Sequence, residues 1–168
     1  FAYCDESGLA EPLKRSVLHH ALRGEVDVYT DPLASPTGYP FKVVHWPADP
    51  SPETARKRVC DLGYLRTAYR RPDGRVGYRC ASEPVDLFLK KGGEESQTVG
   101  RKCLCNALLA NIGQAQVRAD GTHEPTLLTS GDELKHIATF LAGRTRYSAA
   151  DVIAWLMGEV PEGLAARA

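Results

Sequence analysis

Four cysteines could bind one metal ion together: Cys60, Cys80, Cys103 and Cys105, with 19, 22 and one residue between successive members. Thiolate sulfurs suit tetrahedral Zn²⁺ or an iron–sulfur cluster. In an α-helix, residues two apart point about 200° away from each other, so Cys103 and Cys105 can share a metal only in a loop or a first helical turn. The alternative is that all four are small buried hydrophobic side chains, as free cysteine often is.

A second candidate site is cationic. Gly100, Arg101 and Lys102 come at the start of the most apolar predicted helix, where two cations oppose the helix dipole unless an anion is bound there. The phosphate of a flavin or of a nucleotide would be such an anion. The alternative is that both side chains bend into solvent or pair with Glu94 and Glu95.

The elements that must position these residues follow from hydrophobic spacing and turn residues. Capping-box patterns at Ser130/Glu133 and, more weakly, at Ser148/Asp151 predict two helix starts. Prolines at 47, 50 and 52 set the main boundary, giving domains 1–46 and 47–168. The predicted elements are a strand end at 1–3, a helix over 8–23, strands over 26–29 and 41–46, a hairpin over 69–80, and helices over 82–89, 101–112 and 130–141.

Composition narrows the function classes. The 168 residues carry 21 basic and 21 acidic side chains, and 43% are hydrophobic, so we expect a folded domain without a nucleic-acid-binding arm or an acidic tail. The longest uncharged apolar stretch, 104–112, is far shorter than the roughly 20 residues of a membrane span. Five cysteines are an odd number, which favours reduced thiols in a cytoplasmic protein over a disulfide framework.

Five segments are similar to the C-terminal part of a bacterial branch of the FMN-dependent nitronate monooxygenases, formerly called 2-nitropropane dioxygenases. They are Phe1–Leu9, Thr30–Val44, Cys60–Arg66, Gly77–Cys80 and Gly100–Gly113. The resemblance implies an α/β fold: residues 1–46 would be the end of the last strand, the last helix and the return segment of a (β/α)8 flavoprotein barrel. Residues 47–168 would be an appended, mainly helical region with short hairpins.

The resemblance also implies a function. The chain would be the C-terminal portion of an FMN-dependent oxidoreductase that oxidises a nitronate or a similar small molecule. The segment from Ser35 to Lys42 would return over the barrel mouth, so Thr37, Gly38 and Lys42 could approach the flavin or the substrate. The alternative, favoured where the barrel is absent, is a plain crossover between strands that Pro36 and Pro40 make rigid. None of the five histidines matches the catalytic base of the family, which lies upstream, and we therefore expect no catalytic residue here and no turnover by the isolated chain.

A different class of function stays open. The chain could be a noncatalytic structural or partner-binding module that cysteine-bound metal stabilises and that docks on a barrel supplied by another chain. The apolar stripe of the first predicted helix would then be covered by that partner or by a second copy of the chain. Neither hypothesis involves a nucleic acid or a membrane.

Overall fold

The computed structural model describes residues 1–49, 56–60 and 62–159. It divides into two compact units, which are described separately. Unit 1 comprises Phe1–Val28, Val44–Ala48 and Ser130–Ala168, and unit 2 comprises Tyr29–Val43 and Asp49–Thr129. The two short strands β1 (Asp27–Asp31) and β2 (Phe41–His45) pair in a two-stranded sheet, and each contributes residues to both units.

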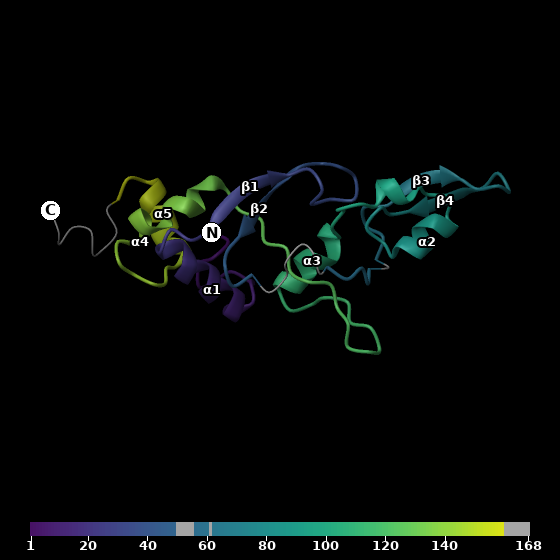
Figure 1. Ribbon diagram of the computed structural model, residues 1–168. Helices are drawn as coiled ribbons and strands as arrows, with labels where there is room; N and C mark the ends of the chain where they lie inside the picture. Colours follow the sequence, from purple (N-terminus) through teal and green to yellow (C-terminus); the bar gives the residue numbers. More distant parts are fainter. Residues whose placement is uncertain (50–55, 61, 160–168) are drawn as a thin grey trace. The chain divides into compact units, whose positions relative to one another are not determined.

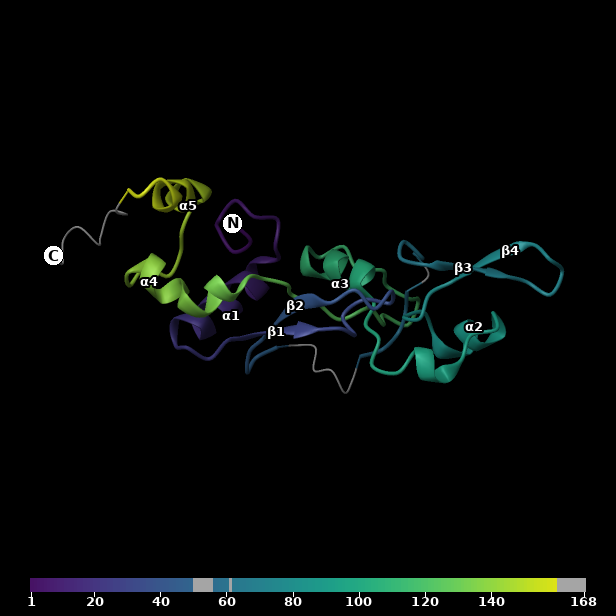
Figure 2. The same cartoon turned by 90° about the horizontal axis from the view of Figure 1, so that it is seen from above.

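Unit 1 is built from helices. In Figures 1 and 2, α1 (Glu11–Leu22) lies beside the 3₁₀ helix η3 (Asp132–His136) and the following α4 (Ile137–Leu141). The apolar stripe of α1 recurs at helical spacing and is buried at Leu13, Val17, Leu18 and Ala21. Trp46 is buried too, and its indole N–H donates to the Ser16 hydroxyl at 3.0 Å. The last helix, α5 (Ala149–Leu156), begins with a complete capping box between Ser148 and Asp151.

The described residues of unit 2 form a hairpin, two α-helices and a 3₁₀ helix. Strands β3 (Thr67–Arg70) and β4 (Val76–Arg79) pair antiparallel, and α2 (Val85–Lys90) lies beside them in both views (Figures 1 and 2). The short η2 (Glu95–Gln97) and then α3 (Leu104–Asn111) follow along the chain. One hydrophobic cluster consists of Ala34, Val43, Leu104, Ala107 and Leu127, with Phe41 and Leu65 packed against it.

The expected fold class is wrong. The described residues form five α-helices and two two-stranded sheets, a mixed α and β arrangement rather than the end of a (β/α)8 barrel. Residues 1–7 form turns and bends instead of a strand end. The physical reason lies in α1, which buries its apolar stripe next to η3 and α4 rather than on a parallel sheet.

Candidate functional site

Two segments of unit 2 that lie far apart in the sequence meet at residues 31–38 and 100–102, a contact we call the loop junction. The Arg101 guanidinium Nη1 donates to the carbonyl oxygens of Pro32 at 2.9 Å and Ser35 at 3.2 Å. The backbone N–H of Lys102 donates to the carbonyl of Leu33 at 3.0 Å. The loop is therefore held at several points by residues about 70 positions away.

A buried ion pair lies at the base of the loop junction. The Lys102 ammonium contacts the Asp31 carboxylate, and the two side chains are only 6% and 7% exposed. The other Asp31 oxygen accepts a hydrogen bond from the Leu33 backbone N–H at 2.7 Å. Breaking a pair buried in this way leaves an uncompensated charge in a region of low dielectric constant. Lys102 thus stabilises the start of the loop.

Two glycines make the close approach at the loop junction possible. Gly38 and Gly100 both have positive φ, 80° and 69°, a conformation that other residues adopt only with strain. A Cβ added to Gly38 would lie 3.4 Å from Nη1 of Arg101, and one added to Gly100 would lie 2.7 Å from Cδ1 of Leu33. The positive φ therefore favours glycine at both positions, and at Gly100 the Leu33 side chain would also have to shift to admit a Cβ.

The structure brings most of the predicted cofactor-binding residues together. Gly38 touches Arg101, and the Thr37 hydroxyl lies 2.7 Å from that of Ser35 and is exposed at the tip of the loop. Lys42 is exposed on β2. Arg101 and Lys102 are engaged within the chain, so the expected binding of a phosphate there stays a prediction. The six predicted residues are Thr37, Gly38, Lys42, Gly100, Arg101 and Lys102.

The four cysteines predicted to bind a metal all belong to unit 2, and Cys60 and Cys80 line the same small cavity. Cys60 contributes to raising the pKa of each of the other three. Cys60, Cys80 and Cys103 are buried, and Cys105 is partly exposed. We call these four residues the thiol cluster.

The start of α3 satisfies the geometric condition that the sequence set for a shared metal. Cys103 is the N-cap residue, with extended backbone angles of φ −83° and ψ 90°, and the helix begins at Leu104. Cys105 therefore lies in the first turn, and the two thiols are not separated by the 200° rotation of a regular helix. Among the described residues, no three His, Cys, Asp or Glu side chains are gathered closely enough to hold a metal ion as they stand.

Burial sets the protonation of the thiol cluster. It raises the pKa of Cys80 and of Cys105. The hydrogen bond with Cys60, together with burial, raises the pKa of Cys103. Without a metal these groups are thus neutral thiols at pH 7 rather than nucleophilic thiolates.

Arg58 connects the chain segments around the thiol cluster. Its guanidinium donates to the carbonyl of Ala81 at 2.9 Å and to that of Arg101 at 3.3 Å, and it also contacts the Thr98 carbonyl. Glu124 lies close by and is 1% exposed; burial raises its pKa to about 7 although Arg56 and Arg58 oppose the shift. The surroundings of the cysteines are thus rich in buried polar groups.

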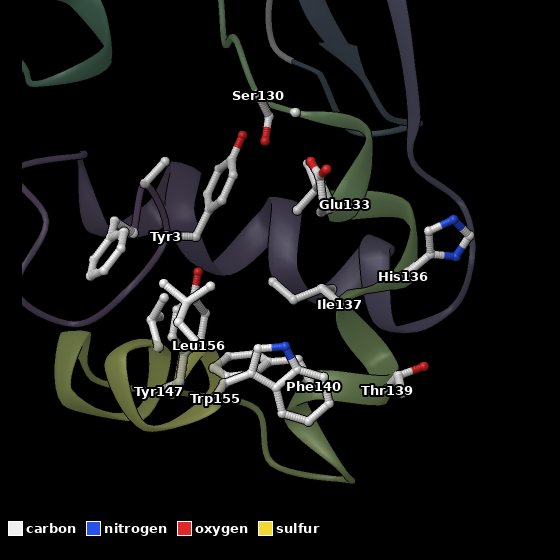
Figure 3. Close-up of a pocket in the computed structure, with 15 residues that line it drawn as sticks. Tyr3, Ser130, Glu133, His136, Ile137, Thr139, Phe140, Tyr147, Trp155 and Leu156 are labelled. Atoms are coloured by element: carbon white, nitrogen blue, oxygen red, sulfur yellow. The ribbon is translucent and has the colours of Figure 1, made fainter. Parts of the chain in front are cut away.

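Unit 1 contains a cavity of about 720 Å³ that the sequence did not reveal (Figure 3). Phe140 is one of the lining residues and makes edge-to-face contacts with Tyr147 and Trp155, at centroid distances of 5.1 and 5.6 Å. Figure 3 shows the Tyr3 hydroxyl pointing toward Ser130, while the His136 ring points away from the cavity. The only sequence signal was the run of aromatic side chains near both ends of unit 1, which is equally typical of a core.

Comparisons with known proteins add no relative. A scan against protein-family models found no matching family, and searches of curated proteins and of solved structures found no match. Among the described residues, no helix combines the length and the apolar character that crossing a membrane requires. A functional proposal therefore depends on the residues of the chain itself and on the resemblance of its five segments.

Proposed function

We propose that the chain is the noncatalytic C-terminal portion of a cytoplasmic, nitronate monooxygenase-like FMN-dependent oxidoreductase. The observation that carries this proposal is the loop junction. It joins Thr30–Val44 to Gly100–Gly113, the two longest segments that resemble the family, through the hydrogen bonds of Arg101 and Lys102. Two segments on which the resemblance rests are thereby parts of one structural feature.

The proposed role of the loop junction is to present a rigid loop to a flavin site. Loops that a fixed scaffold positions commonly carry binding residues. Here the loop tip exposes the Thr37 hydroxyl, and β2 exposes the Lys42 ammonium. Both groups can donate hydrogen bonds to an oxygen of the flavin or of the substrate. When bound, FMN supplies the oxidation chemistry itself.

The same geometry divides the six candidate residues into two roles. Lys102 is enclosed and paired with Asp31, and Arg101 donates to loop carbonyls. These two cations fit a role in holding the loop better than a role as a phosphate cradle. We therefore assign Thr37, Gly38 and Lys42 to contact with flavin or substrate, and Gly100, Arg101 and Lys102 to positioning.

The test is to produce the protein from its complete reading frame and to measure bound flavin and nitronate-dependent oxygen consumption. The account predicts a flavin absorption spectrum and oxidation of the nitronate, and neither from the 168-residue chain alone. A colourless product of the complete reading frame that consumes no oxygen would overturn the proposal.

A pair of lysine variants tests the role of the loop within that enzyme. Lys42→Ala should lower kcat/KM for the nitronate by about tenfold, the equivalent of one lost hydrogen bond to a charged group. Lys90→Ala is the matched control, because Lys90 is an exposed lysine of unit 2 that lies on α2. Equal kcat/KM values for the two variants would remove Lys42 from the site.

A further inference from the structure

We infer that Cys60, Cys80, Cys103 and Cys105 together bind one zinc ion that stabilises unit 2. This site is independent of the flavin chemistry proposed above. The chemistry is a set of four thiolate ligands, which zinc binds tetrahedrally in closed structural sites. Each of the four Zn–S bonds replaces an S–H bond whose proton passes to solvent, and no oxidation or reduction is involved.

Specific hydrogen bonds bring the three cysteine-bearing segments together. Arg58, two residues before Cys60, donates to the carbonyls of Ala81 and Arg101. The hydroxyl of Ser82, two residues after Cys80, donates to the carbonyl of Lys102 at 2.5 Å. Each segment is therefore fixed next to the others within two residues of its cysteine.

The positions of the thiols also fit four ligands. Cys60 and Cys80 line one small cavity, and Cys103 and Cys105 flank the first residue of α3. A tetrahedral zinc with Zn–S bonds of about 2.3 Å places its sulfurs about 3.8 Å apart. Because no three ligand side chains among the described residues are gathered as they stand, binding requires the four thiols to move together around the ion. Cys103 and Cys105 can both face it because the helix begins between them.

A small cavity lies beside Cys60 and Cys80 and contains compensating charge. Its volume is about 60 Å³, and its lining includes Arg66, Arg79, Lys91 and Glu83. Lys91 is paired with Glu83 at 2.5 Å, so Arg66 and Arg79 supply the excess positive charge. Four thiolates and one Zn²⁺ carry a net charge of −2, which nearby cations stabilise. Arg58 adds a further positive charge that interacts with Cys80 and Cys103.

The alternative, that the four cysteines only pack as small hydrophobic side chains, explains their surroundings less well. Three of the four cysteines are buried, and hydrogen bonds rather than apolar contacts join the chain segments that carry them. The buried polar groups around Cys60, which include Arg58 and Glu124, are also unlike the surroundings of a purely apolar packing site.

The first experiment is metal analysis of the reduced, purified chain by mass spectrometry. The inference predicts one zinc per chain, released by a mercurial thiol reagent. Replacement with Co²⁺ should give the visible spectrum of tetrahedral cobalt with thiolate ligands. This spectrum is a readout on the unaltered sequence, so it does not depend on whether a variant folds.

Cysteine variants identify the ligands. Cys105→Ser, at the partly exposed position, should lower zinc content and change the cobalt spectrum. Cys4→Ser should leave both unchanged, because Cys4 is a buried free cysteine of unit 1. Zinc well below one per chain in the reduced wild-type protein would overturn the inference. Iron with the absorption of an iron–sulfur cluster, or a Cys60–Cys103 disulfide in place of metal, would overturn it too. Equal zinc loss in Cys4→Ser and Cys105→Ser would also contradict it.

Discussion

Unit 1 and unit 2 are stabilised by different kinds of contact. Of the ten buried polar or charged side chains that the structure describes, nine belong to unit 2. The exception is Lys14 of unit 1, whose ammonium donates to the backbone carbonyls of Asp5 and Ser7, each at 3.2 Å. The most deeply buried side chains of unit 1 are otherwise apolar, as in Val17, Trp46 and Leu141.

The difference shows how each unit specifies its structure. Hydrophobic burial is non-directional and tolerates small shifts of the groups that pack together. Buried polar groups are directional, and each costs free energy when its partner is lost. Unit 2 therefore fixes the conformation of the 31–38 loop more strictly than apolar packing alone would, which suits a unit that presents a binding loop.

The largest expected effect comes from breaking the buried ion pair of unit 2. Lys102→Met leaves Asp31 charged and unpaired in a buried position, so the free energy of unfolding should fall by about 3–5 kcal/mol. Urea unfolding measures this change. Lys90→Met is the control, because Lys90 and Asp86 are 3.5 Å apart and mostly exposed, and it should cost less than about 1 kcal/mol. An equal decrease in the free energy of unfolding in the two variants would show that the Lys102–Asp31 pair does not stabilise unit 2 as a buried pair.

A comparable test of unit 1 removes apolar volume. Leu141→Ala empties a fully buried position in α4 and should cost about 2–5 kcal/mol. Hydrogen exchange should locate the lost protection in α1 and α4. The control is Leu156→Ala in α5, because Leu156 is 70% exposed. A loss of protection in Leu156→Ala as large as in Leu141→Ala would show that burial of apolar side chains does not determine the stability of unit 1.

A smaller effect is expected at the loop junction. Gly38→Ala forces a Cβ into a conformation with φ of 80° and next to the Arg101 guanidinium, and it should cost about 1–2 kcal/mol. The thermal midpoint measures it. Gly8→Ala is a neutral comparison, because no atom lies within 4 Å of the added Cβ and its φ is not positive. A Gly38→Ala protein as stable as Gly8→Ala would mean that the loop is not held as described.

The smallest expected effect is at the capping box of α5. The backbone N–H and the hydroxyl of Ser148, together with Arg144, lower the pKa of Asp151 to about 2. Because the folded-state pKa lies below the unfolded value of 3.8, the Asp151 carboxylate stabilises the fold above about pH 4, and this contribution is lost as the pH falls toward 2. Ser148→Ala should cost about 1 kcal/mol.

The measurement for the capping box is urea unfolding at pH values on either side of that window. Asp151→Asn should remove most of the local pH dependence, and Asp132→Asn in η3 should not. Wild-type unfolding that shows no difference from Asp151→Asn across the window would contradict the capping box as the source of the shift.

Local features of the fold could be predicted from the sequence, and long-range ones could not. The stripe of α1, the turn of the β3–β4 hairpin and the Ser148 capping box are set by nearby residues, and their predictions are confirmed. The prediction of a capping box at Ser130 is wrong, because Gly131 is the N-cap residue of a 3₁₀ helix at this position. The prediction of a barrel end was wrong because the spacing of the apolar residues in α1 does not determine which surface covers them.

The candidate sites divide in the same way. The sequence identified the residues of the loop junction and the thiol cluster by type, but nothing in it pairs Lys102 with Asp31, which lies 71 positions away. It also left open whether the step from Cys103 to Cys105 is helical. The structure resolves this point, because α3 begins between the two cysteines.

Directional contacts hold unit 2, and the zinc ion proposed for the thiol cluster would add to them, whereas apolar burial holds unit 1. Hydrogen exchange of the reduced chain, measured before and after zinc is extracted with a mercurial reagent and a chelator, tests it most directly. The account predicts that β3, β4 and α3 lose protection while α1 and α4 retain it. Unchanged protection in unit 2 after extraction, or equal loss in both units, would contradict the claim.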